Sequence, residues 1–112
     1  MSLKRKLYIS GPMTGLPEFN FPAFAQAADW YRTLGCDVLS AHEVKHDEPN
    51  GLGSLPWHEY LRADLIAMLT ECDEIVMLPG WQNSKGATLE RHVAMALGFP
   101  VHHYAQAEMV AV

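Results

Sequence analysis

Segment 74–98, EIVMLPGWQNSKGATLERHVAMALG, constrains the fold more than any other part of the sequence. It opens with a continuous apolar run at 75–78, which is typical of a strand buried on both faces of a parallel sheet. A Pro-Gly break at 79–80 and a polar loop follow, and the apolar residues then recur at helical spacing. Gly98 and Pro100 end this helix. The segment therefore predicts a strand, a loop and a helix, with the loop at the carboxyl edge where open α/β sheets bind ligands.

A carboxylate interrupts the apolar stripe formed by Ala87, Ala94 and Leu97. Glu90 lies three residues after Ala87 and four before Ala94, on the face expected to pack on the sheet. Burying a carboxylate is costly unless something compensates for it, and the helix N-terminus one turn away offers part of that compensation. Glu90 is therefore a candidate nucleophile or general base. The alternative is a tilted helix that leaves Glu90 half exposed.

The loop before this helix has the features of an anion site. Ser84 is suited to the N-cap position, and the backbone N–H groups of Lys85 and Gly86 would then be available to an anionic ligand.

Length and charge limit the classes of function. One hundred and twelve residues predict a single domain, 1–112. A net charge of -5 argues against a nucleic-acid or anionic-membrane surface, because both require a basic patch. No apolar run reaches membrane-spanning length, and the amino terminus has no signal-peptide core. Cys36 and Cys72 are interpreted as small buried residues in a reducing compartment, without a C-x-x-C pair. These features predict a cytoplasmic protein.

The first strand, at 7–10, runs into a turn rich in glycine and proline. The turn reads Gly11-Pro12-Met13-Thr14-Gly15-Leu16-Pro17. Glycines after a first strand allow the backbone to approach a ligand, although a structural turn explains this segment equally simply. It is not a G-x-G-x-x-G motif, and the chain contains no Walker A sequence, so a dinucleotide site is not supported.

A helix is predicted next, with Asn20 as its cap and Gly35 at its end. Its packed stripe consists of Phe24, Ala28, Tyr31 and Leu34. A second strand follows at 36–40, and a helix between two short strands indicates a right-handed βαβ unit.

The segment His42-Glu43-Val44-Lys45-His46 formally matches the zincin motif H-E-x-x-H. That motif binds zinc only on a helix, where residues four apart share a face. Here it directly follows a strand and precedes a helix-breaking stretch, so a polar, mobile loop at 42–55 is the favoured interpretation.

A second helix begins at Pro56. Its core stripe consists of Leu61, Leu65, Met68 and Leu69. Asp64 falls within or beside this stripe, so it is a second carboxylate near a buried face. The simpler alternatives are a partnership with Arg62 or a solvated position.

Three short motifs occur in a distinctive order: Tyr8-Ile9-Ser10-Gly11-Pro12, then Asp64-Leu65, then Ser84-x-Gly86-Ala87-x-x-Glu90. Together with the central strand at 72–76, this set resembles the nucleoside 2-deoxyribosyltransferase-like superfamily. The likeness is to a small branch of uncharacterised bacterial and phage-type proteins, and it extends from about residue 6 to residue 104.

The resemblance implies specific roles. Glu90 would attack the anomeric carbon of a (deoxy)ribosyl group, Tyr8 would orient that carboxylate, and Asp64 would help to protonate or position the departing base. Ser10 to Gly15 would line the base and sugar pocket. In members that act on nucleoside 5′-monophosphates, a serine at the position of Ser84 helps to bind the phosphate. No cofactor and no metal are implied.

The predicted architecture is an open, mostly parallel α/β sheet of four or five strands with helices on both faces. The expected strand order is 2-1-3-4, flavodoxin- or Rossmann-like, with a last strand at 101–104. The first functional hypothesis is N-glycosidic bond cleavage or (deoxy)ribosyl transfer on a small-molecule nucleoside or nucleotide. The alternatives are a non-catalytic nucleotide-binding module and, third, a zinc hydrolase using His42, Glu43 and His46. A homo-oligomer, a dimer or higher, is expected because small sites of this kind are often completed by a symmetry mate.

Overall fold

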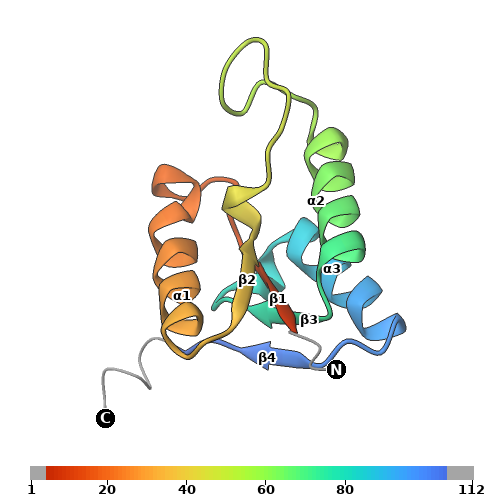
Figure 1. Cartoon of the computed structure of the whole chain (residues 1–112). Coiled ribbons are helices and arrows are strands. Elements are labelled where there is room, and N and C mark those ends of the chain that lie inside the picture. Colours follow the sequence, from red (N-terminus) through yellow and green to blue (C-terminus); the bar gives the residue numbers. More distant parts are fainter. Residues whose placement is uncertain (1–4, 106–112) are drawn as a thin grey trace.

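The computed structural model describes residues 5–105, in which strands and helices alternate (Figure 1). The strands are β1 (Lys6–Ser10), β2 (Asp37–Ser40), β3 (Glu74–Met77) and β4 (Val101–His103). The helices are α1 (Phe21–Thr33), α2 (Trp57–Glu71) and α3 (Lys85–Ala96). Three short 3-10 helices are η1 (Pro17–Asn20), η2 (Ala41–Glu43) and η3 (Trp81–Asn83). None of the helices in the described part of the chain is long and apolar enough to cross a membrane.

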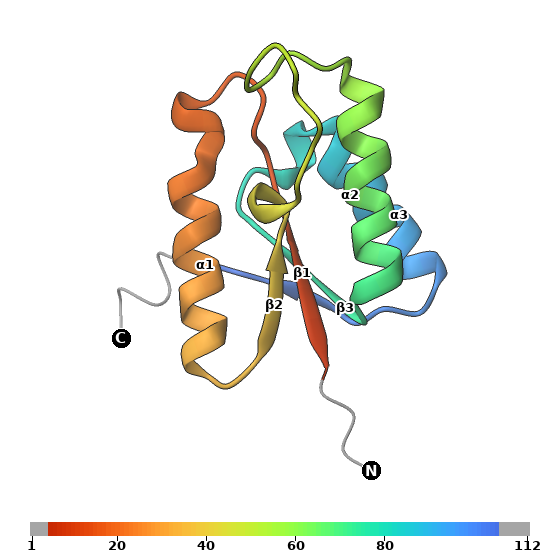
Figure 2. The same ribbon diagram turned by 45° about the horizontal axis from the view of Figure 1, so that its top comes forward.

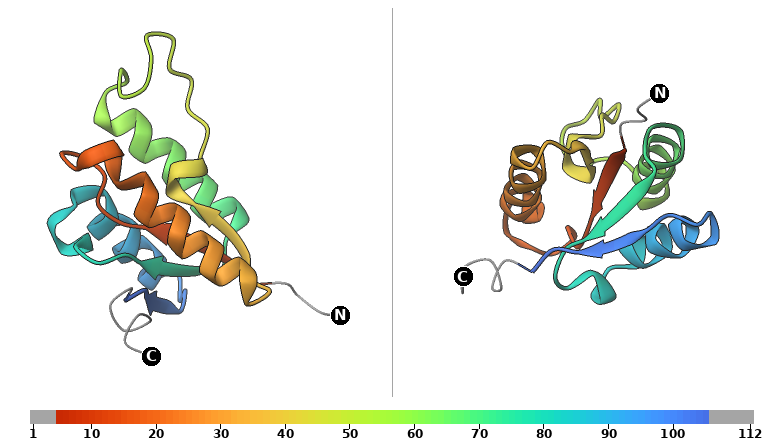
Figure 3. Two further views of the ribbon diagram at one scale, coloured as in Figure 1. Left: turned by 90° about the vertical axis from the view of Figure 1, so that its left-hand side faces the viewer. Right: turned by 60° about the horizontal axis from the view of Figure 1, so that its bottom comes forward.

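The four strands form one parallel sheet in the order β2-β1-β3-β4. This confirms the predicted α/β architecture and strand order. Helix α1 covers one face, whereas α2 and α3 cover the other (Figure 3), as right-handed crossovers require. The long loop between η2 and α2 extends past the carboxyl ends of β1 and β2 (Figure 2).

The core is centred on β1 and β3, as the apolar run at 75–78 predicts. Ile9, Ile75 and Val76 are fully buried.

The predicted apolar stripes of the helices are confirmed only in part. Phe24, Ala28, Met68, Ala87 and Ala94 are buried, but Leu34, Leu69 and Leu97 are exposed. Leu34 and Leu97 each follow the last residue of their helix, so neither continues the stripe that packs on the sheet.

Two smaller predictions also need correction. Asn20 does occupy the N-cap position of α1, but its backbone is left-handed (φ 61°) and its side chain makes no capping bond. Its amide instead donates to the Pro12 carbonyl at 3.0 Å, which braces the turn after β1. Cys72 is buried as predicted, whereas Cys36 is only half-buried, and both are free thiols.

Gly11 lies at a close approach between the ends of β1 and β3. A Cβ built on Gly11 would be 2.7 Å from the Cβ of Leu78, which is fully buried. We expect Gly11→Ala to lower the free energy of unfolding by about 1–3 kcal/mol, because a packed core resists an added methyl group. Urea denaturation measures this difference. Gly86→Ala is the matched control, since its added Cβ meets no atom closer than 4.0 Å. Equal destabilisation by both substitutions would contradict this explanation.

Candidate active site

Glu90 is a buried carboxyl group at the carboxyl edge of the sheet. Its exposed fraction is 4%. The Tyr8 hydroxyl donates to its Oε2 at 3.0 Å, and the Ser10 hydroxyl donates to its Oε1 at 2.6 Å. Tyr8 and Ser10 are two apart on β1, so both face the side of the sheet that α3 covers. Each carboxyl oxygen thus receives one hydroxyl hydrogen bond, and the carboxyl group is held in one orientation.

The predicted burial of Glu90 is therefore confirmed, and the half-exposed alternative is wrong. Tyr8 lies where the resemblance implies, against this carboxyl group. Ser10 was expected only to line a pocket, but it contacts Glu90 directly. The sequence signal for that contact was the alternation along β1, because residue 10 shares the face of residue 8.

Burial, and to a smaller extent the nearby Asp64, together raise the pKa of Glu90 to about 8, against the hydrogen bonds from Ser10 and Tyr8, which lower it. Burial also raises the pKa of Asp64 to about 7. The pKa of Tyr8 lies well above its usual value, chiefly through burial, so Tyr8 remains a hydrogen-bond donor. The site therefore contains two carboxyl groups that titrate near neutral pH. Because the two groups interact, their apparent pKa values describe the pair rather than either residue alone.

A second buried carboxylate, Glu74, provides a contrast. It begins β3 and is 1% exposed. Arg5 Nε lies 2.5 Å and His102 Nε2 lies 2.6 Å from its carboxyl oxygens. Glu74 thus has basic partners, as a structural ion pair does, whereas Glu90 is held by neutral hydroxyls. Arg91, which follows Glu90 in the chain, packs its guanidinium over the Trp81 ring at 4.6 Å.

Ser84 caps α3, as predicted. Its side-chain oxygen accepts a hydrogen bond from the Ala87 backbone N–H at 3.1 Å. The N-terminus of α3 therefore lies at the carboxyl edge of the sheet, where its dipole favours negative charge. A shallow depression beside this N-terminus is lined by Gln82, Asn83, Ser84, Lys85, Thr88, Leu89 and His92. It does not include Glu90, so the concave surface and the buried carboxyl group lie on different sides of the first turns of α3.

The turn after β1 is placed at the same edge, but its residues are not equivalent. Gly11 is packed against Leu78, and Met13 is partly buried against the core. Pro12 is tied to Asn20 through its carbonyl. Gly15 is exposed, with a left-handed backbone (φ 83°) and open space around it. Of the residues predicted to line the pocket, only Ser10 has a hydrogen bond to Glu90.

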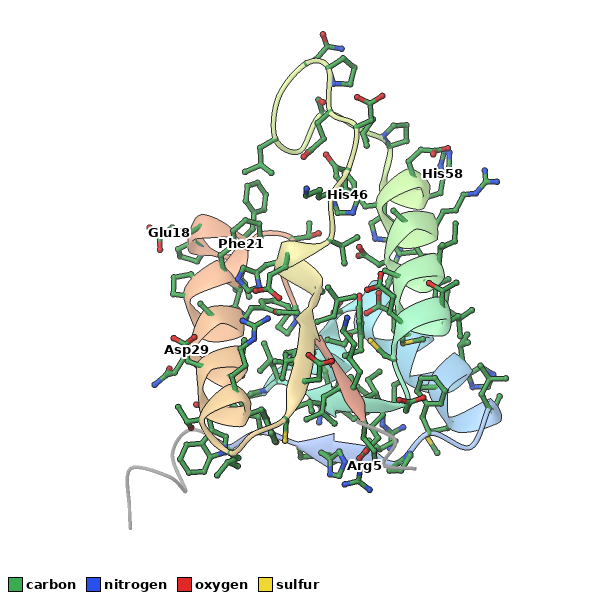
Figure 4. The ribbon with its side chains drawn as sticks, viewed as in Figure 1. Arg5, Glu18, Phe21, Asp29, His46 and His58 are labelled. Carbon is green, nitrogen blue, oxygen red and sulfur yellow. The ribbon has the colours of Figure 1, made fainter. Side chains whose placement is uncertain are left out.

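The zincin-like segment does not gather its three residues into one site. His42 Nδ1 lies 2.6 Å from the Ser40 hydroxyl, and Glu43 forms an ion pair with Arg32 at 2.8 Å. His46 lies on the side of its loop that faces α2, whereas His58 lies farther out at the start of that helix (Figure 4). No cluster of three metal-ligating side chains occurs within residues 5–105. This arrangement gives no support to the zinc hydrolase.

Asp64 pairs with a residue that the sequence did not suggest. Its Oδ1 lies 3.1 Å from His46 Nε2, and both side chains are largely buried. Neither a partnership with Arg62 nor a solvated position describes Asp64. The two residues are separated by an irregular loop, and no local spacing indicates such a pairing.

Fold and site together define an α/β protein with a parallel sheet and two carboxyl groups of raised pKa at its carboxyl edge. The family model described as Domain of unknown function (DUF4406) matches residues 5–103, and the chain belongs to this family. A search of curated proteins found no match.

Proposed function

We propose that the protein cleaves the N-glycosidic bond of a nucleoside or nucleoside 5′-monophosphate, with Glu90 as the nucleophile. The observation that carries this proposal is the buried Glu90, oriented by Tyr8 and Ser10 and close enough to Asp64 to change its pKa. Retaining cleavage of a glycosidic bond needs a nucleophilic carboxylate and a second group that handles a proton. The resemblance to the nucleoside 2-deoxyribosyltransferase-like superfamily supports the same assignment.

The reaction has two steps. In the first, a carboxylate oxygen of Glu90 bonds to C1′ and the C1′–N bond breaks. Its electron pair goes to the base, which takes a proton from the Asp64 carboxyl group. In the second, water bonds to C1′ and gives its proton to the Asp64 carboxylate, while the ester bond to Glu90 breaks. A second base in place of water makes the reaction a (deoxy)ribosyl transfer.

The raised pKa values leave one proton on the pair between about pH 7 and 8, and the higher pKa of Glu90 places that proton mainly on Glu90. The reactive state is the minor arrangement, in which Asp64 holds the proton and Glu90 is ionised. Hydrogen bonds from Tyr8 and Ser10 favour that ionised form. Because Glu90 is buried, a substrate reaches it only when the residues that cover it move. The turn at 11–16 and the loop at 44–56 lie at this edge of the sheet.

The N-terminus of α3 favours a substrate that carries a phosphate. Ser84 and Lys85 begin this helix, and its dipole and backbone N–H groups attract an anion. We therefore favour a 5′-monophosphate over a free nucleoside.

A non-catalytic nucleotide-binding module is the second candidate. The observation that favours it is the same burial of Glu90, because a carboxyl group with a pKa of about 8 is mostly protonated at neutral pH. A protonated carboxyl group held by two hydroxyls also serves as a structural hydrogen-bonding group.

Release of free base from ribo- and deoxyribonucleosides and their 5′-monophosphates tests the proposal. Chromatography should detect free base from at least one compound. For the preferred base and sugar, the KM for the 5′-monophosphate should be lower than the KM for the nucleoside. Saturable binding without release from any compound would favour the binding module instead. Equal KM values for nucleoside and monophosphate would contradict the role given to the N-terminus of α3.

The pH dependence of kcat/KM provides a further prediction. Raised pKa values of about 7 for Asp64 and about 8 for Glu90 predict a bell-shaped profile with its maximum between these values. At lower pH both groups are protonated and the nucleophile is lost. At higher pH both are ionised and the proton donor is lost. Initial rates from pH 5 to 10 measure the profile, and a rate that does not change across pH 6–9 would show that this pair does not carry the reaction.

A further inference from the structure

His46 is the one group in the described residues with a hydrogen bond to Asp64. It comes from the loop between η2 and α2, and its Nε2 lies 3.1 Å from Asp64 Oδ1. The exposed side-chain fractions are 13% for His46 and 16% for Asp64, so water competes little for this contact.

The loop is fastened to α2 in a way that holds the imidazole in place. The His46 ring packs edge-on against the Tyr60 ring, with centroids 4.8 Å apart and an interplanar angle of 72°. The Tyr60 hydroxyl donates to Glu48 and accepts the Leu55 backbone N–H at 3.2 Å. Tyr60 and Asp64 are four residues apart on α2 and share a face. One helix face therefore supplies both the wall for the imidazole and its carboxyl partner.

We propose that His46 is a positioning residue that fixes the orientation of the Asp64 carboxyl group for proton transfer. This role rests on the proposed function. The Nε2–H of His46 donates to Asp64 Oδ1, which leaves the acidic proton on Oδ2. When the C1′–N bond breaks, that proton passes from Oδ2 to the base nitrogen, which receives the bond's electron pair. His46 keeps its own proton throughout and stabilises the carboxylate that remains.

The proposal predicts how the pH profile responds to loss of the imidazole. A hydrogen bond donated to the ionised carboxylate lowers the pKa of Asp64. Removing it should therefore raise the pKa of Asp64 and move the pH maximum of kcat/KM upward. The other titratable groups around the pair of His46 and Asp64 are Glu48 on the loop, Tyr60 on α2, Tyr8 on β1 and Glu90 on α3. Each is retained in the variants below.

Three variants test the role. His46→Ala should lower kcat about 10- to 100-fold, with KM changed less than about threefold, and should shift the pH maximum of kcat/KM upward. His46→Gln should restore most of kcat and return the pH maximum to its wild-type position, because its amide can donate to Asp64 as the imidazole does. His58→Ala removes an exposed imidazole from the start of α2 and should change neither quantity.

The outcomes separate this proposal from the one on which it rests. No base release by the wild-type protein overturns the proposed function and the role of His46 with it. If the wild-type protein releases base and His46→Ala has an unchanged kcat and an unchanged pH maximum, only the role of His46 is overturned. A loss that His46→Gln does not restore, or that His58→Ala reproduces, also overturns it. Urea unfolding of each variant at the assay pH shows whether an observed loss reflects an unfolded protein.

Discussion

Glu90→Gln is expected to abolish base release, with kcat/KM lowered by a factor on the order of 10⁴. An amide cannot ionise and cannot form the ester with C1′ that the two-step reaction requires. Glutamine has nearly the same shape as glutamate, and its amide can still hydrogen-bond to the hydroxyls of Tyr8 and Ser10. Loss of activity would therefore reflect lost chemistry rather than a collapsed site. Chromatography of reaction mixtures at the pH optimum measures the effect.

Two further measurements make this result specific. Glu90→Gln should still bind the preferred nucleotide, and the wild-type protein quenched during turnover should carry a (deoxy)ribosyl adduct that mass spectrometry places at residue 90. Glu59→Gln is the control, because Glu59 is a partly exposed carboxylate in the first turn of α2. It should leave kcat/KM unchanged. Base release by Glu90→Gln at the wild-type rate would show that Glu90 is not the nucleophile.

The fold and the centre of the candidate site were predictable because both depend on local patterns. A continuous apolar run marks a strand buried on both faces, and a carboxylate at position 90 between Ala87 and Ala94 must face the sheet if its neighbours do. The cap at Ser84 follows from residue type and position alone. Parallel strands place their carboxyl ends at one edge, which brings residues 8, 10 and 90 together without any knowledge of loop structure.

Several features that the sequence did not predict depend on irregular segments or on the ends of helices. His46 meets Asp64 because the 44–56 loop is tied to Tyr60 through Glu48, and no periodicity encodes that closure. Asn20 adopts a left-handed backbone and hydrogen-bonds to the turn after β1 rather than to its own helix. Leu97 has the spacing of a core residue, but the helix ends one residue before it. In each of these cases tertiary contacts or the helix end override the local preference.

The stability of the protein is expected to fall as pH rises from about 5 to 9, and Glu90→Gln should remove much of that fall. Burial raises the pKa of Glu90 from 4.5 to about 8, so the folded protein binds this proton more tightly than the unfolded chain does. The resulting stabilisation is complete below the unfolded pKa and is lost as pH rises through the folded pKa. Glutamine never ionises. The variant should therefore gain on the order of 4 kcal/mol over the wild-type protein between pH 5 and pH 9.

Urea denaturation at pH 5, 7 and 9 measures this difference, and the comparison across pH removes any constant effect of the substitution. Asp64→Asn should also gain stability over the wild-type protein as pH rises. Most of that gain should be complete near pH 7, because the pKa of Asp64 is raised to about 7. Glu59→Gln should follow the wild-type curve. If the gap between Glu90→Gln and the wild-type protein does not change with pH, Glu90 does not titrate in this range. The bell-shaped activity profile would then lose its physical basis, because the same ionisation that destabilises the folded protein prepares the nucleophile.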